Sequence, residues 1–257
     1  MNDDSLLSGL PIDLIRAAYL AAPGNEIESG KFASPESSAA LVANAFGLFL
    51  DQPSILPPLP SVSRIGWPAS SVGLEVTLRF PWSGGRHPCL DVLIATDTAL
   101  IGIESKRYEP FRPKSKSELS EAYWRPVWGN SMHGYERIRD GLRDGSCQFA
   151  RLDAAQLVKH AFGLRTVVHA DANFVGKKPV LFYLYAEPKV WPGTKGEVSI
   201  EDRVIHRKEI GQFASMVSED EIVFRYCSYA ELLAAWQTSA NPIVQSHATA
   251  IVERFAP

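Results

Sequence analysis

The chain has 257 residues, which is long enough for one sizeable α/β core and only marginally long enough for two domains. Hydrophobic residues make up 46% of it and charged residues 21%, an ordinary globular composition, and the net charge of −3 excludes a protein that holds nucleic acid through overall positive charge. Its three cysteines are widely spaced and match no metal-binding pattern, which fits a reducing compartment. The start is acidic where a signal peptide is basic, and no apolar run approaches the roughly 18 residues of a membrane span. We therefore expect a cytoplasmic protein without a membrane segment, folded as a single domain over residues 1–257.

Hydrophobic periodicity predicts an alternation of helices and strands along the chain. We expect helices at 10–21, 34–50, within 118–143, and at 152–162, 198–216, 229–237 and 243–254. We expect strands at 73–82, 90–95, 99–103, 166–170, 179–186 and 221–226. Short links join the first three strands, so these should form an antiparallel meander at the heart of the sheet. The expected fold class is α/β, with a mixed central sheet flanked by helices.

Two helix ends are assigned from local signals. Ser34, Pro35 and Glu36 have the pattern of an N-cap, a proline at the first helical position and an acidic residue facing the helix dipole. Gly163 follows the apolar face of the helix over 152–162 and should lie just past its C-terminus.

The segment from Pro88 to Tyr108 carries the pattern that points to chemistry. Two apolar runs are separated by a short polar turn, and Asp91, Glu104 and Lys106 interrupt them. Residues two apart in a strand share a face, so Glu104 and Lys106 should lie together, and a hairpin would bring Asp91 close to them. Two carboxylates that repel each other can be relieved by a hard divalent cation, and a lysine beside them can orient water or neutralise charge on a phosphate. This arrangement suits metal-assisted hydrolysis of a phosphodiester.

A bland interpretation competes with this one, because a Glu-x-Lys triplet in a strand is often a solvated edge with a weak ion pair. The chain holds a second such triplet, from Glu187 to Lys189, with Asp171 upstream. In that case a glycine-lysine turn separates the aspartate from the glutamate, and Pro188 ends the strand between Glu187 and Lys189. The spacing therefore favours the first triplet as the site.

Basic and aromatic residues follow the first triplet. They are Arg107, Tyr108, Phe111, Arg112, Lys114 and Lys116, with Tyr123, Trp124, Arg125 and Trp128 further on. Such a loop can hold a phosphate backbone or stack on a base, or it can be an ordinary solvated loop.

The spacing of Asp91 and Glu104-Ser105-Lys106 resembles the PD-(D/E)xK nuclease superfamily. The segments 86–91, 101–106 and 156–160 resemble, more narrowly, a group of bacterial restriction-endonuclease-like proteins, over most of the chain. One departure is that Pro88 stands three residues before Asp91 and not next to it. The resemblance implies a restriction-endonuclease-like fold, with Asp91 and Glu104 as ligands of Mg²⁺, or of Mn²⁺ as an alternative, and Lys106 as the residue that orients or activates water.

The resemblance also raises secondary candidates. Some members place a glutamine on the helix after the Glu-x-Lys strand, which makes Gln156 a candidate for positioning the substrate. Members often carry a further carboxylate on the first core helix, which points to Glu36, although a helix start explains that residue at least as well. Glu75 on the preceding strand and Glu109 in the following loop are further carboxylates whose role stays open.

The function expected is that of a Mg²⁺-dependent endonuclease that hydrolyses DNA. The superfamily also has members without nuclease activity, so a nucleic-acid-binding or regulatory protein of the same fold is an alternative, and an RNA-directed nuclease is another. Cutting both strands of a duplex would need two sites, which suggests a homodimer, but no segment specifies one.

Overall fold

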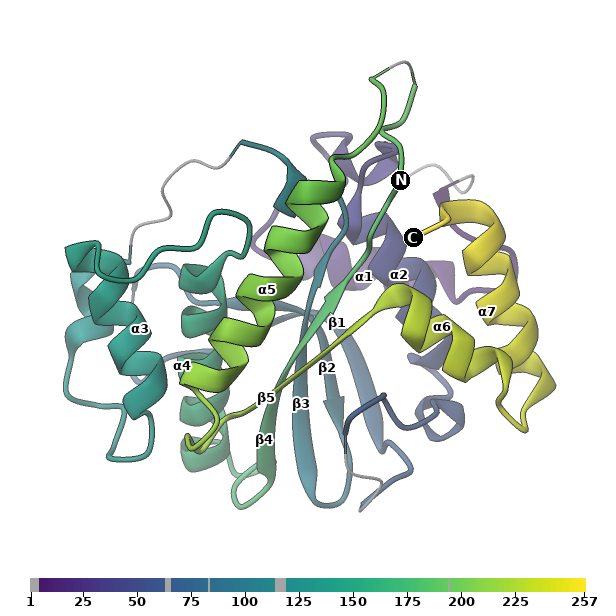
Figure 1. Ribbon diagram of the computed structural model, residues 1–257. Coiled ribbons are helices and arrows are strands. Elements are labelled where there is room, and N and C mark those ends of the chain that lie inside the picture. Colours follow the sequence, from purple (N-terminus) through teal and green to yellow (C-terminus); the bar gives the residue numbers. More distant parts are fainter. Residues whose placement is uncertain (1–4, 63–65, 83, 114–118, 194) are drawn as a thin grey trace.

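A five-stranded mixed sheet forms the centre of the molecule in the computed structural model, which describes residues 5–62, 66–82, 84–113, 119–193 and 195–257 (Figure 1). The strand order follows the chain order, from β1 (Ser71–Thr77) through β2 (Cys89–Ala95), β3 (Ala99–Lys106) and β4 (Lys178–Tyr185) to β5 (Val223–Ser228). The first three strands are antiparallel, as expected, whereas β4 and β5 each run parallel to the strand before them. The predicted α/β class with a mixed sheet and a β1–β2–β3 meander is confirmed.

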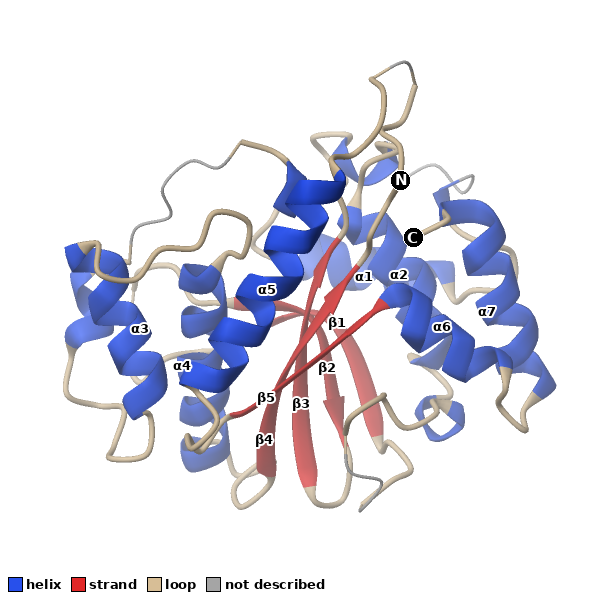
Figure 2. Cartoon of the chain, in the orientation of Figure 1, coloured by secondary structure: helices blue, strands red, loops and turns tan. Residues whose placement is uncertain are grey.

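Helices cover both faces of this sheet (Figure 2). Seven α-helices occur among the described residues: α1 (Ile12–Ala21), α2 (Ser38–Phe46), α3 (His133–Asp144), α4 (Ala154–Ala170), α5 (Ile200–Met216), α6 (Tyr229–Gln237) and α7 (Pro242–Phe255). Short 3-10 turns lie at Lys31–Ala33, Gly47–Phe49, Pro53–Ile55, Glu109–Phe111 and Glu121–Trp124. Between β3 and β4 the chain forms α3 and α4, and a crossover of this length is what allows the two strands to run parallel.

Two apolar layers hold the helices to the sheet. One lies between the sheet and α1, α2, α6 and α7, and the other between the sheet and α3, α4 and α5. Trp236 of α6 is completely buried in the first layer, where its ring meets Phe46 and Phe49 edge-on at 5.5 and 5.3 Å between centroids. Trp236 is therefore an anchor of this layer, since a buried aromatic side chain stabilises a core by roughly 1.5–3 kcal/mol through apolar burial.

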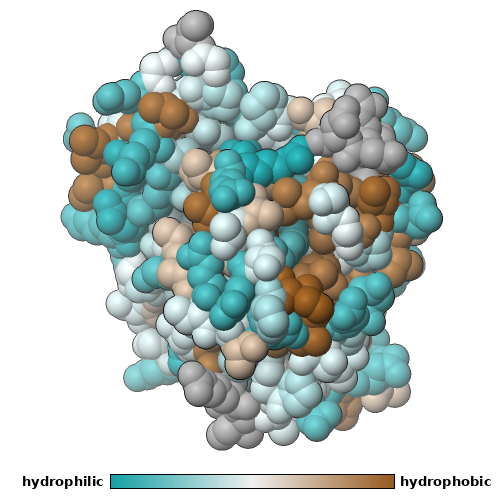
Figure 3. All heavy atoms as spheres, turned by 90° about the vertical axis from the view of Figure 1, so that its right-hand side faces the viewer, coloured by the Kyte–Doolittle hydropathy of each residue, from teal (hydrophilic) through white to brown (hydrophobic). Residues whose placement is uncertain are grey.

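The outer face of α6 and α7 mixes hydrophilic and hydrophobic residues (Figure 3). Single apolar side chains such as Ile243 and Val252 of α7 are exposed there, which is ordinary for a protein surface. Among the described residues, no helix combines the length and the apolar character needed to cross a membrane.

The two-stranded ribbon of β1 and β2 rotates about its long axis near its middle, so that residues two apart there face opposite sides of the sheet. Residues two apart in a regular strand share a face. Here Leu74 packs in one apolar layer and Val76 in the other, and Leu90 and Val92 differ in the same way on the neighbouring strand. Between Leu74 and Val76 lies Glu75, whose φ of 53° is rare for a residue with a side chain.

Two predictions about helix ends were wrong. The structure has no strand at 166–170, because α4 continues through Gly163 to Ala170. Gly163 is in the helix interior, where it serves close packing: a Cβ there would lie 2.9 Å from Pro88 Cγ and 3.0 Å from Leu78 Cβ. The second helix begins at Ser38, not after Ser34, because the hydroxyl that accepts the first free N–H, from Ala40 at 3.0 Å, belongs to Ser37.

Candidate active site

Asp91 and Ser105 meet where β2 and β3 diverge. Regular pairing of these strands ends at Val92 opposite Ile103, while β3 continues to pair with β4 as far as Lys106. Just beyond the last pair, the Ser105 N–H donates to Asp91 Oδ2 at 2.5 Å. The Asp91 carboxylate therefore accepts the hydrogen bond that a backbone carbonyl of β2 would accept in a regular ladder. From this point on, β3 is no longer paired with β2.

Glu104 and Lys106 lie together on the face of β3 that α4 covers. Glu104 is 1% exposed, and one of its carboxylate oxygens forms an ion pair with the Lys106 ammonium. The other oxygen lies 2.8 Å from Nε2 of His160, which is 2% exposed on α4. The expected convergence of Asp91, Glu104 and Lys106 is thus present in the structure, with His160 added to it.

The pKa values of Asp91 and Glu104 are shifted in opposite directions. Burial and the negative charge of Glu104 raise the pKa of Asp91 well above its usual range, although Lys106 opposes this. Burial alone would raise the pKa of Glu104 too, but Lys106 and His160 lower it to about 2. Burial likewise disfavours the charge of Lys106, yet Glu104, Glu109 and Asp91 together raise the pKa of its ammonium above the usual value. Lys106 therefore keeps its proton, and Glu104 keeps its negative charge.

Glu75 is a third carboxyl group at this site. It lies opposite Asp91 in the β1–β2 register, between the pairs Leu74–Val92 and Val76–Leu90. Burial, followed by a smaller contribution from Glu104, raises the pKa of Glu75 to about 7. A positive φ at a partly buried carboxylate is the kind of backbone strain that functional sites hold.

The other candidates lie apart from this cluster or at its margin. The Gln156 N–H donates to the Asp153 cap at 3.0 Å, and in the described part of the chain its side chain makes no hydrogen bond to the cluster. Glu36 precedes α2 and forms ion pairs with Lys195 and Arg112, which lower its pKa. Glu109 accepts hydrogen bonds from the Ser38 hydroxyl at 2.5 Å and the Arg107 N–H at 2.8 Å, and its charge reaches Lys106.

The loop after Lys106 differs from the exposed basic and aromatic loop considered above. Tyr108 and Phe111 are buried in a small cluster with Val198, so their rings cannot stack on a base as they lie. Arg107 is buried as well, while Lys114 and Lys116 lie outside the described residues. The burial of Tyr108 and Phe111 was not foreseen, because an alternation of charged and aromatic residues does not reveal which side chains another segment will cover.

The second Glu-x-Lys triplet lies beyond the end of β4. Glu187 is paired with Arg207 of α5 at 3.2 Å, and Asp171 follows the C-terminus of α4, before β4 begins. The two acidic residues are thus at opposite ends of β4, which agrees with the preference for the first triplet.

The cluster supplies oxygen ligands for a hard cation, though not a complete set. Within the described ranges, no three His, Cys, Asp or Glu side chains are grouped closely enough to hold a metal ion by themselves. Mg²⁺ commonly uses only one or two carboxylates and keeps several waters, so Asp91 and Glu104 fit such a site. Burial and, after it, the negative charge of Glu104 raise the pKa of Asp91, and a divalent cation would relieve this repulsion.

Comparisons with known proteins add no assignment: no protein-family model, no curated protein and no solved structure matches the chain. The resemblance noted in the sequence therefore stays a prediction.

Proposed function

We propose that this chain is a Mg²⁺-dependent nuclease of the PD-(D/E)xK, restriction-endonuclease-like type that hydrolyses DNA phosphodiester bonds. The observation that carries the proposal is the convergence of Asp91, Glu104 and Lys106 at the diverging ends of β2 and β3. The mixed sheet flanked by helices agrees with that fold at a coarse level.

Asp91 and Glu104 would hold the metal in this mechanism. A bound Mg²⁺ supplies a Lewis acid that polarises the phosphate and makes a water more acidic. His160 touches the Glu104 carboxylate from α4 and fixes its orientation. Glu75 adds a carboxyl group that can be neutral or charged near neutral pH, because its pKa is about 7.

Lys106 acts as a cation in this proposal. The carboxylates around it raise its pKa, which favours the protonated form over the neutral amine that could take a proton from water. An ammonium at this position can orient the attacking water and neutralise the charge that develops on the phosphate. Of the two roles considered for Lys106, the electrostatics favours orientation.

The test is cleavage of supercoiled and linear DNA by wild type and Lys106→Ala, with Mg²⁺, Mn²⁺ or EDTA. We expect metal-dependent cutting by wild type and a loss of about a hundredfold or more in the variant, since removal of one preorganised stabilising group typically costs that much. Lys208→Ala, which removes an exposed lysine on α5, is the matched control and should cut normally. Full activity of a folded Lys106→Ala protein would refute the mechanism.

A nucleic-acid-binding protein without catalysis is the second candidate. It is favoured by the near-complete burial of Glu104, whose two oxygens are already paired with Lys106 and His160. In that case DNA or RNA would bind in EDTA with an affinity that Asp91→Asn and Glu104→Gln leave unchanged, and neither nucleic acid would be cut. Cleavage of RNA alone would instead assign the site to an RNA-directed nuclease. Sedimentation of the active protein on DNA would show whether two copies combine for double-strand cutting.

A further inference from the structure

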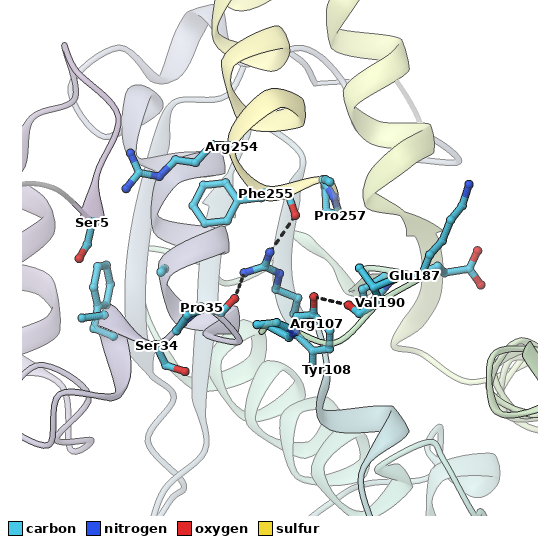
Figure 4. A pocket seen from close by; sticks show the side chains of 17 residues that line it. Ser5, Ser34, Pro35, Arg107, Tyr108, Glu187, Val190, Arg254, Phe255 and Pro257 are labelled. Atoms are coloured by element: carbon cyan, nitrogen blue, oxygen red, sulfur yellow. Dashed lines mark hydrogen bonds between the residues drawn. The ribbon is translucent and has the colours of Figure 1, made fainter. Parts of the chain in front are cut away.

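A cavity of about 1070 Å³ opens beyond the end of β3, next to the proposed catalytic residues. Its wall includes Arg107 and Tyr108, which directly follow Lys106, and it is completed by residues 32–35, 187–190 and 254–257 together with Ser5, Ala40 and Pro192 (Figure 4). Asp91, Glu104 and Lys106 are not part of this wall. The cavity is therefore a separate compartment one residue along the chain from the catalytic lysine.

Arg107 brings a buried positive charge to this wall without a carboxylate beside it. Only 6% of the residue is exposed, and its guanidinium donates to the carbonyl oxygens of Pro35 at 2.7 Å and Phe255 at 2.8 Å (Figure 4). Its Nε is buried and has no hydrogen-bond partner among the described residues, and no carboxylate of the described chain lies within ion-pair distance. Glu109 and Glu36 favour its charge only from further away.

Such a charge is costly in the protein alone. Burial disfavours an ion unless it is paired, and carbonyl dipoles compensate it only in part. Tyr108 and Phe255 place their rings 5.2 Å from the guanidinium carbon, which adds a weaker cation–π attraction. An anion in the cavity would supply the missing counter-ion.

The remaining wall indicates the kind of anion. Lys189 is exposed at the rim, where it adds a second positive charge, while the nearby Glu187 is already paired with Arg207. Phe255 is partly exposed and contributes an aromatic surface, whereas Phe32 and Tyr108 line the cavity but are almost fully buried. The volume of about 1070 Å³ is slightly above the range in which small-molecule sites usually fall, roughly 300–1,000 Å³, and so leaves room for more than a phosphate.

We infer that this cavity binds a nucleotide, with its phosphate against Arg107 and Lys189 and its base against Phe255, the partly exposed ring of the wall. The inference rests on the proposed function, because the nucleotide bound in the cavity would be adjacent to the nucleotide whose phosphodiester bond is hydrolysed. The same chemistry could come from a nucleic-acid strand or from a free nucleotide.

The test is a calorimetric titration in EDTA, where no cleavage occurs, with three probes: a 5′-phosphorylated DNA tetranucleotide, a nucleoside 5′-monophosphate and inorganic phosphate. The variants are Arg107→Met, which removes the buried charge, and Lys189→Glu, which reverses the charge at the rim. Lys189→Glu leaves the carbonyl contacts of Arg107 intact, so it remains informative if Arg107→Met does not fold. Arg137→Glu, an exposed charge reversal on the distant α3, is the matched control (Figure 1).

We expect one of the two nucleotide probes to bind more tightly than inorganic phosphate, and Lys189→Glu to weaken this binding by about tenfold or more, with less than about twofold in Arg137→Glu. Tighter binding of the tetranucleotide would identify a strand as the occupant, and tighter binding of the mononucleotide a free nucleotide; both support the inference. No binding at millimolar concentration, equal binding of phosphate alone, or equal effects of the two charge reversals would overturn it. Because the assay contains no metal, its outcome is independent of whether Lys106→Ala abolishes cleavage.

Discussion

Glu104 shows how a single buried carboxylate can stay ionised. Water does not reach it, and the stabilisation that water would provide comes from Lys106 on the same strand and His160 on α4. Asp91, a strand away, has only a backbone N–H at 2.5 Å and the more distant charge of Lys106, so its pKa is raised and not lowered. Burial would raise the pKa of both groups, but their different neighbours shift the two pKa values in opposite directions.

Glu75 leads to a prediction about pH. Its carboxyl group keeps a proton up to about pH 7 in the folded protein, whereas in the unfolded chain it loses the proton near 4.5, so folding becomes less favourable as pH rises between these values. Glu75→Gln should therefore gain stability over wild type across this window, by at most about 3 kcal/mol above it. Urea unfolding at pH 5 and pH 8 measures the gain.

The control for this experiment is Glu253→Gln, which changes an exposed carboxylate on α7. Its effect on the free energy of unfolding should be similar at both pH values. A Glu75→Gln effect that does not grow with pH would contradict the assignment of a strained, partly neutral carboxyl group.

Only the part of the site whose residues lie close together in the sequence was predictable from the sequence. Strand periodicity and a short turn are enough to bring Asp91, Glu104 and Lys106 together. His160 lies more than fifty positions later, and a lone histidine on a helix is commonly a core residue. Its contact with Glu104 depends on how α4 docks on the sheet, which periodicity does not specify. For the same reason Gln156, one turn before His160, could not be placed relative to the cluster.

At the scale of elements, α4 was predicted too short. A glycine after an apolar helical face usually marks a helix end, but Gly163 lies in the interior and lets the helix approach Pro88 and Leu78. The residues after it, including Val167 and Val168, favour strands and still continue the helix, because they are buried against the same apolar layer. Tertiary packing overrides local preference here.

This packing predicts opposite effects for two Gly→Ala substitutions. Gly163→Ala should destabilise the protein by about 1–3 kcal/mol, because its Cβ would meet a proline ring and the base of a leucine side chain. Gly211→Ala on α5 meets no atom within 4 Å and should stabilise by about 0.5–1 kcal/mol through helix propensity. Thermal or urea unfolding of the two variants measures both effects, and equal signs would show that helix propensity, not contact with the sheet, decides at Gly163.

At the scale of the whole molecule, the order of elements and the meander were predictable, since hydrophobic periodicity marks each strand that the structure has. The direction of β4 was not predicted, because a strand was expected at 166–170; the long helical connection that the structure has there explains the parallel pairing. The rotation of the β1–β2 ribbon at Glu75 was not foreseen, because a positive φ at a glutamate leaves no signal in the residue type. Because of this rotation, Leu74 and Val92 pack in one apolar layer, and Val76 and Leu90 pack in the other.

Metal binding should be visible as global stability, apart from any activity. A ligand that binds only the folded state at about ten times its Kd stabilises by roughly 1.4 kcal/mol, or about 3–5 °C in Tm for a protein of this size. We expect 10 mM Mg²⁺ to raise the Tm of wild type relative to NaCl of equal ionic strength, and to have little effect on Asp91→Asn. The same rise in both proteins would place the ion elsewhere.

The crossover between β3 and β4 has a consequence for how the molecule folds. Asp91, Glu104 and Lys106 belong to one hairpin closed by a short turn, so their contacts cost little loop-closure entropy. His160 and β4 are distant in sequence, and their contacts form only when a long loop has closed. Until α4 docks, Glu104 faces water and has only Lys106 beside it. We therefore expect burial of the site, and with it the electrostatic difference between Asp91 and Glu104, to be among the later events of folding.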